Sequence, residues 1–163
     1  TEGYNGMAGT VVFDLDGTLA DTSADLIAAA NACFQARGLG ALRDPVEDAL
    51  IAFHGGRAML RAGYARLPGD TLLPPGAEDQ DYPRLLDHNS NGIAVHTRLY
   101  PGTEDALERL AADGHRLAVC TNKPAALAEP LLRVLGSRER FAAMIGADTL
   151  PVRKPDPRPY KAA

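Results

Sequence analysis

Apolar and polar positions along this chain change their spacing from one segment to the next. Residues 10–13 (TVVF) form a short apolar, β-branched run that ends at Asp14. This is the pattern of a buried strand in a parallel sheet, with an acidic residue at its carboxyl end. Apolar side chains then recur at helical spacing from Ser23 to Arg37, and Gly38 follows as a stop. The start of the chain therefore predicts one strand and one amphipathic helix.

The middle of the chain carries only helical repeats and loops. Capping residues and apolar spacing predict helices over residues 44–53 and 57–67, and a less regular helix over residues 82–95. No strand pattern occurs between Asp21 and Val95. We therefore expect this whole stretch to be helical.

Helices and strands alternate after this helical block. The pattern predicts helices over residues 103–112 and 124–135, and strands over residues 116–120 and 142–146. One strand, an all-helical block and then alternating elements predict an α/β fold, in which a parallel sheet is interrupted by a helical insertion.

The same order implies two domains on a discontinuous chain. We expect an α/β catalytic core over residues 7–20 and 96–163, and a helical domain over residues 21–95. Residues 1–6 precede Met7 and show no periodicity, so we interpret them as an expression scar.

Composition narrows the class of protein. The 163 residues are 45% hydrophobic and 23% charged, which is typical of a folded globular chain. No apolar run approaches the roughly twenty residues of a membrane-spanning helix or the roughly seven of a signal peptide core. The net charge of -4 and the lack of a basic cluster argue against nucleic acid as a partner.

Cys33 and Cys120 have no CxxC spacing, so we expect free thiols and a cytoplasmic protein, with its oligomeric state left open.

Chemistry-bearing residues follow the predicted strands. Asp14 and Asp16 come after the first strand, Thr121 to Lys123 after the second, and Lys154 in the loop after the third. Ligands of open α/β sheets bind beyond the carboxyl ends of the strands, so these side chains should converge. Two carboxylates, a hydroxyl and an ammonium group suit phosphoryl transfer.

Each of these groups has a chemical use in that reaction. A carboxylate such as Asp14 can attack phosphorus and form an aspartyl-phosphate. Asp16 could protonate the leaving oxygen and later activate water, and Gly17 allows the sharp turn that brings it over the site. The two carboxylates together would attract Mg²⁺.

Three segments resemble the signature motifs of a known family. These are DLDGTLADT at residues 14–22, CTNKP at 120–124 and RKPDP at 153–157. They are similar to the first three motifs of the haloacid dehalogenase superfamily, and the surrounding sequence is most similar to its bacterial phosphoglycolate phosphatases. The resemblance covers nearly the whole chain, strongly in the α/β parts and loosely in the helical block.

The resemblance implies a role for each motif residue. Asp14 would be the nucleophile and a Mg²⁺ ligand, and Asp16 would be the general acid and base, with its backbone carbonyl on the metal. Thr121 and Lys154 would hold the phosphoryl oxygens, with Asn122 beside them at the substrate. The helical block would be a cap domain that closes over the site and selects the substrate.

Two local assignments stay open at this point. Gly55, Gly56 and Arg57 lie where the family's cap carries a substrate-specificity loop, and Arg57 could pair with a substrate carboxylate. They could equally form an ordinary helix start. Lys123 lies in the turn of the second motif, and a purely structural role is the simpler interpretation.

The family's fourth motif is the main departure. It places an acidic Mg²⁺ ligand on a strand after Lys154, and this sequence ends shortly after that residue. Asp148 precedes the lysine and would lie on the wrong strand. We expect the C-terminal core strands to be absent from this chain, either because the chain is truncated or because the molecule lacks one metal ligand.

The leading hypothesis is a Mg²⁺-dependent phosphatase acting on a small phosphorylated acid, with 2-phosphoglycolate as the expected substrate. A sugar phosphomutase of the same superfamily is the nearest alternative, and a catalytically impaired phosphate-binding relic is another. A haloacid dehalogenase needs no second acid, so Asp16 argues against it. A phospho-accepting receiver domain carries its nucleophile on a middle strand, unlike the first-strand acidic pair of this chain.

Overall fold

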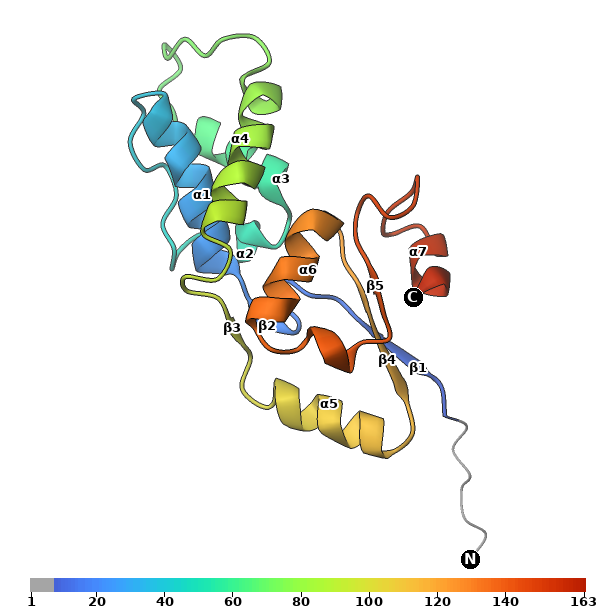
Figure 1. The fold of residues 1–163 in the computed structure, drawn as a ribbon. Coiled ribbons are helices and arrows are strands. Elements are labelled where there is room, and N and C mark those ends of the chain that lie inside the picture. The colour runs from blue at the N-terminus through green and yellow to red at the C-terminus, as the bar shows by residue number, and fades with distance from the viewer. Residues whose placement is uncertain (1–7) are drawn as a thin grey trace, which may run out of the picture. The chain divides into compact units, whose positions relative to one another are not determined.

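A three-stranded parallel sheet forms the centre of one of the two units into which the chain divides. The computed structural model describes residues 8–163 (Figure 1). The first unit, here called the core unit, contains the chain up to Leu19 and Leu99–Ala163. The second, the helical unit, is Ala20–Arg98. Each unit is described by itself.

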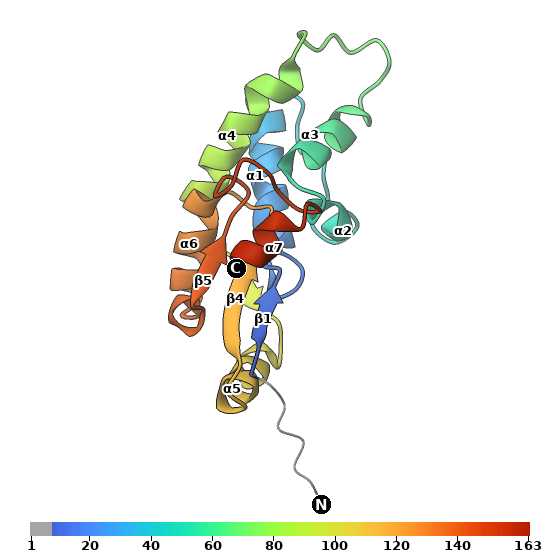
Figure 2. The same ribbon diagram turned by 90° about the vertical axis from the view of Figure 1, so that its right-hand side faces the viewer.

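The sheet of the core unit has the order β1-β4-β5, as Figure 2 shows. Its strands are β1 (Thr10–Phe13), β4 (Arg116–Cys120) and β5 (Ala143–Ile145). Both pairings are parallel, with Phe13 opposite Val119 and Cys120 opposite Ile145. The predicted α/β fold with a parallel sheet is confirmed. The carboxyl ends of all three strands therefore meet at one edge of the sheet.

Helices lie on both sides of this sheet. The two figures place α5 (Thr103–Ala112) and α6 (Ala125–Val134) on one side and α7 (Arg158–Ala162) on the other. A short 3₁₀ helix, Arg138–Arg140, follows α6. The side chains of β4 are buried from Leu117 to Cys120, and burial of each large apolar side chain contributes about 1.5–3 kcal/mol.

Strand β1 is less buried than the sequence pattern predicts. Thr10 is exposed and Val11, Val12 and Phe13 are half-buried. The physical reason is the place of β1 in the sheet: it pairs with β4 along one edge, and no strand of residues 8–163 pairs with the other. Phe13 still packs against Phe141, with ring centroids 6.3 Å apart in an edge-to-face arrangement.

Four helices build the helical unit around an apolar cluster. They are α1 (Ser23–Ala36), α2 (Ala49–Ala52), α3 (Gly56–Tyr64) and α4 (Ala77–Asn91). Figure 1 shows α1 and α4 side by side, with α3 packed on both. The cluster includes Ile27, Phe34, Met59, Leu60 and Leu85, all fully buried.

Two helices differ from the sequence prediction. The expected helix over residues 44–53 shrinks to α2 and residues 45–48 form turns, although the predicted cap is present, since Oδ1 of Asp44 accepts the N–H groups of Val46 and Glu47. Helix α4 begins at Ala77, earlier than the predicted residue 82. Gly76 precedes it in the left-handed conformation, with φ 72°. Glu78 then lies in the first turn, where an acidic group stabilises the start of a helix.

Two short strands were not predicted from the sequence. They are β2 (Ala20–Asp21) and β3 (Arg98–Leu99), and they pair with each other. Strands of two residues are too short to show alternation. Within residues 8–163, no helix combines the length and apolar character that a membrane crossing requires. Both cysteines are free and buried.

Candidate active site

The first catalytic candidate, Asp14, lies directly after β1 and is paired with Lys154. Nζ of Lys154 is 3.0 Å from Oδ1 of Asp14, which also accepts the backbone N–H of Leu15 at 2.7 Å. The Asp14 side chain is 46% exposed, whereas that of Lys154 is 12% exposed. The carboxylate is therefore accessible to a ligand, while the ammonium group is held beside it.

The second candidate, Asp16, has a lysine of its own. Nζ of Lys123 is 3.0 Å from Oδ1 of Asp16, and these side chains are 5% and 17% exposed. Gly17 follows with φ 77°, a conformation that glycine adopts without strain, and so turns the chain after Asp16. Sequence reasoning treated Lys123 as a turn residue and missed this contact. The signal that could have found it is its place at the end of β4, the neighbour of β1.

The turn after β4 contributes two further polar side chains, those of Thr121 and Asn122. Thr121 is buried, and its Oγ1 accepts the N–H of Lys123 at 3.1 Å. An accepting hydroxyl can still donate its own hydrogen. Nδ2 of Asn122 donates to the backbone carbonyl of Lys154 at 3.2 Å. Asn122 thus fastens the third motif to the second, and the structure brings together all four residues predicted as catalytic with Asn122 in one unit.

Two other carboxylates near this edge have structural partners. Oδ1 of Asp148 accepts the N–H of Ala125, the first residue of α6, at 2.8 Å. Asp156 pairs with Arg158 at 2.8 Å, and this hydrogen-bonded guanidinium lowers the pKa of Asp156 to about 2. Asp148 therefore caps a helix, and Asp156 belongs to an ion pair at the start of α7.

A buried thiol lies next to the candidate catalytic residues. Cys120 precedes Thr121 at the end of β4 and is buried. Burial raises the pKa of its thiol, while nearby Lys154 opposes this shift and Asp14 adds to it. Cys120 thus lies near both Asp14 and Lys154, out of contact with solvent.

The donor set suits a magnesium ion. Asp14 and Asp16 present hard oxygen atoms, the ligands that Mg²⁺ prefers. Among residues 8–163 no group of three or more histidine, cysteine, aspartate or glutamate side chains forms a complete metal site. This is compatible with Mg²⁺, which is usually bound through one or two carboxylates together with water and substrate phosphate.

The predicted substrate-specificity residues belong to the helical unit. Gly55 adopts φ 94° immediately before α3, and a Cβ on Gly56 would approach Cδ2 of Leu85 to 2.8 Å. Arg57 lies 2.6 Å from Asp79 and 3.4 Å from Glu78, with its guanidinium 4.4 Å from the Tyr82 ring centroid. A substrate carboxylate would have to compete with these two acidic side chains for Arg57.

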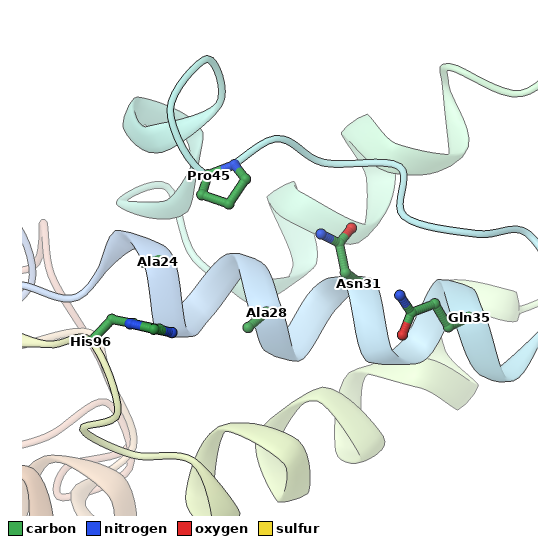
Figure 3. Close-up of a pocket in the computed structure, with 6 residues that line it drawn as sticks. All are labelled: Ala24, Ala28, Asn31, Gln35, Pro45 and His96. Carbon is green, nitrogen blue, oxygen red and sulfur yellow. The ribbon is translucent and has the colours of Figure 1, made fainter.

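A separate pocket lies along α1 in the helical unit, and Figure 3 draws its lining residues. It is lined by Ala24, Ala28, Asn31, Gln35, Pro45 and His96. Asn31 is already occupied, because its amide bonds both the N–H and the carbonyl of Arg43. The lining has no lysine or arginine, so it offers no fixed cation for a phosphate group.

Paired aspartates directly after the first strand of a parallel sheet, each beside a lysine, are chemically suited to binding and transferring a phosphoryl group. The family model for haloacid dehalogenase-like hydrolases matches residues 8–163. The chain belongs to this family, which confirms the resemblance read from the three motifs.

Curated and solved relatives support the same family. A phosphoglycolate phosphatase of Mesorhizobium japonicum is 39% identical over 148 residues, covering 91% of this chain and 64% of that protein. The crystal structure of a predicted phosphoglycolate phosphatase from Haemophilus somnus has a TM-score of 0.79 at 27% identity, covering 95% of this chain and 68% of the other. CbbY from Rhodobacter sphaeroides, solved in complex with phosphate, has a TM-score of 0.72 at 27% identity, covering 96% and 71%.

The chain spans 64% of the length of the Mesorhizobium relative. The activity and substrate of the whole protein are therefore treated as proposals.

Proposed function

We propose that this protein is a Mg²⁺-dependent phosphatase that hydrolyses a small phosphorylated acid, with 2-phosphoglycolate as its substrate. The observation that carries the proposal is the pairing of Asp14 with Lys154 and of Asp16 with Lys123 at the carboxyl ends of neighbouring strands. One carboxylate is accessible for attack, and the second stands two residues away for proton transfer.

In the first step, a carboxylate oxygen of Asp14 attacks phosphorus, and the bond between phosphorus and the ester oxygen breaks. Asp16 gives its proton to the departing oxygen, so an alcohol leaves and an aspartyl-phosphate remains. Lys154 and the hydroxyl of Thr121 would stabilise the phosphoryl oxygens. Asp14 and the backbone carbonyl of Asp16 would hold Mg²⁺, whose positive charge would help to neutralise these oxygens.

In the second step, water attacks the phosphorus of the aspartyl-phosphate. Asp16, now ionised, accepts a proton from this water, and the bond between phosphorus and the Asp14 oxygen breaks. Inorganic phosphate leaves, Asp14 is again a carboxylate and Asp16 again carries a proton. The enzyme thus returns to its starting state.

The substrate assignment is supported by the names of the relatives. The Mesorhizobium protein and the solved Haemophilus protein are both described as phosphoglycolate phosphatases, and CbbY was solved with phosphate bound. We propose further that residues 21–95 act as a cap domain that selects the substrate, with Gly55, Gly56 and Arg57 as its specificity segment.

Replacing the nucleophile tests the function. Asp14→Asn should abolish turnover of 2-phosphoglycolate and of p-nitrophenyl phosphate by the natural-length protein, because an amide cannot serve as the attacking anion. The matched control is Asp113→Asn, the same chemical change at an exposed residue at the end of α5. It should keep wild-type turnover.

Metal removal completes this test. A chelator should stop hydrolysis by the wild-type protein, and added Mg²⁺ should restore it, since the Asp14 carboxylate and the Asp16 carbonyl are the oxygen ligands that Mg²⁺ prefers. Wild-type turnover of phosphate esters by Asp14→Asn would refute the proposed mechanism. A chelator-resistant activity would refute its Mg²⁺ dependence.

A further inference from the structure

We infer that Lys123 is a positioning residue for Asp16: its ammonium group holds the carboxyl group in the orientation from which it exchanges protons with the leaving oxygen and then with water. This inference rests on the proposed function and deepens it. It gives Lys123, which the sequence placed only in the turn of the second motif, a role in the proposed reaction.

The burial of Lys123 is the first argument. Its side chain is 5% exposed, and an ammonium group taken out of water is costly unless a charged partner compensates it. Its one ion pair within residues 8–163 is the 3.0 Å contact with Asp16. A solvated loop lysine would keep its ammonium group in water, whereas Lys123 is buried with its ammonium group against the carboxylate of Asp16.

The two ion pairs of the site are separate, which is the second argument. Lys154 contacts Asp14 at 3.0 Å, and Lys123 contacts Asp16 at the same distance. Lys154 faces the nucleophile, and its ion pair does not include Asp16. A second lysine from a different strand end fixes the one group whose direction must suit two successive proton transfers.

The backbone on both sides of the Lys123–Asp16 contact is held in place. The N–H of Lys123 donates to Oγ1 of Thr121 at 3.1 Å, and its carbonyl accepts the N–H of Ala147 at 3.0 Å. Asp16 lies between the fully buried Leu15 and the turn at Gly17. An ion pair between two fixed segments restricts the rotamer of Asp16 more than a contact between mobile loops would.

The chemistry explains why such positioning matters. As Asp16 releases its proton to the leaving oxygen, negative charge develops on its carboxylate, and the ammonium of Lys123 already faces that charge. The same contact keeps the carboxyl group of Asp16 in place for the second step, in which it accepts a proton from water. Lys123 therefore need not touch the substrate to accelerate both steps.

Leaving-group dependence separates this role from others. An alkoxide needs a proton to depart, whereas p-nitrophenolate leaves readily without one. Lys123→Met keeps much of the side-chain volume and removes the charge. We expect it to lower kcat/KM for 2-phosphoglycolate and for ethyl phosphate about tenfold to a hundredfold, which is part of the roughly 10²–10⁴-fold that general acid–base catalysis supplies. The kcat/KM for p-nitrophenyl phosphate should change less than about threefold, well below that range.

A second readout follows from the hydrolytic step. Because a misplaced Asp16 also activates water poorly, Lys123→Met should show a burst of p-nitrophenol close to the enzyme concentration, followed by slow turnover. Lys161→Met, which removes an exposed ammonium from α7, serves as the control and should change none of these values.

Other patterns would overturn the inference. An equal loss on all three esters would mean that Lys123 binds phosphate or only supports the fold. A loss confined to 2-phosphoglycolate would mean that it binds the substrate carboxylate. If Lys123→Met does not fold, Lys123→Gln takes its place in the same assays with the same expected pattern.

Failure of the inference is distinguishable from failure of the proposed function. If Asp14→Asn retains activity, the proposed function is wrong whatever Lys123 does. If Asp14→Asn is inactive but Lys123→Met shows no selective loss on alkyl esters, the function stands and Lys123 is not a positioning residue.

Discussion

Gly63 shows how one missing side chain shapes the helical unit. It lies in α3 against the ring of Phe34, which is fully buried in the apolar cluster. A Cβ at this position would come closer than 3.0 Å to three ring atoms of Phe34. The absence of a side chain at residue 63 therefore lets α3 approach α1.

Gly63→Ala is expected to destabilise the protein. Alanine favours a helix over glycine by about 0.5–1 kcal/mol, but overpacking a filled core costs about 1–3 kcal/mol, and the ring of Phe34 is fully buried. Urea denaturation measures the difference. Gly69→Ala is the control, because nothing lies within 4 Å of its added Cβ. A more stable Gly63→Ala protein would show that Phe34 can repack.

Arg57 offers a second test at the scale of single residues. If it pairs with the substrate carboxylate, Arg57→Ala should raise KM for 2-phosphoglycolate about tenfold to a hundredfold, since a charge-assisted hydrogen bond contributes about 1.5–3 kcal/mol. Ethyl phosphate should be unaffected. Arg61→Ala removes a guanidinium that also pairs with Glu78, so it controls for loss of that ion pair. Equal losses on both esters would remove Arg57 from substrate recognition.

The residues of the site were largely visible in the sequence. Asp14, Thr121 and Lys154 could be found because each follows a strand, and strand ends of a parallel sheet meet at one edge. Their proposed roles stay predictions. The contact between Lys123 and Asp16 was not foreseen, since it depends on the direction of a long side chain, which spacing along the chain does not determine.

At the scale of elements, one buried carboxylate connects three helices. Asp81 in α4 is fully buried and accepts two hydrogen bonds from Arg37, at the end of α1. It also accepts hydrogen bonds from the hydroxyl of Tyr64 in α3 and from Arg84. Burial acts to raise the pKa of Asp81, but the bonds from Arg37 and Tyr64 outweigh it, so the pKa is lowered overall.

Asp81→Asn is expected to cost about 1.5–3 kcal/mol of stability, because it removes the charged acceptor of the hydrogen bonds from Arg37 and Tyr64. Thermal unfolding followed by circular dichroism measures this loss. Asp87→Asn, at an exposed residue of the same helix, should stay within about 0.5 kcal/mol of wild type. A wild-type melting temperature for Asp81→Asn would mean that the three helices do not depend on this carboxylate.

The same network makes stability depend on pH. The folded pKa of Asp81 is below its ordinary value of about 3.9, so its stabilising effect is fully present above that pH and is lost as the pH falls further. The difference in stability between wild type and Asp81→Asn should therefore shrink in acid. A difference that grows as the pH falls below about 4 would contradict the sign of this shift.

Element boundaries were harder to predict than element types. The expected helix over residues 44–53 was mostly wrong, because the side chain of Asp44 satisfies backbone donors in turns as well as it would in a helix. The strands β4 and β5 were found nearly to the residue, since short apolar runs between helices have few alternatives. β2 and β3 escaped prediction, as their two-residue pairing is set by tertiary structure.

At the scale of the whole molecule, each unit has its own buried apolar interior. Leu60 lies in the cluster of the helical unit, whereas Leu117 is buried on β4 of the core unit. Leu60→Ala removes buried apolar volume and should cost about 2–5 kcal/mol. Hydrogen exchange should accelerate within Ala20–Arg98 and remain unchanged in β4.

Leu117→Ala provides the reciprocal control, with faster exchange expected in β4. Equal acceleration of both units by Leu60→Ala would show that they unfold as one cooperative body.

Hydrogen bonds join the segment where the chain enters the helical unit to the segment where it leaves. Some of these bonds lie inside the helical unit and others inside the core unit. The carboxylate of Asp25, in the first turn of α1, accepts the backbone N–H groups of His96 and Thr97 at 2.8–3.0 Å. In the core unit, the carbonyl of Leu19 accepts the N–H of Tyr100 at 3.0 Å. The inserted segment thus leaves the core chain and rejoins it across a gap that one hydrogen bond spans. A different insert whose termini meet could be grafted between Leu19 and Tyr100 at little cost in loop-closure entropy, so this junction gives evolution or an engineer a place to exchange one inserted module for another.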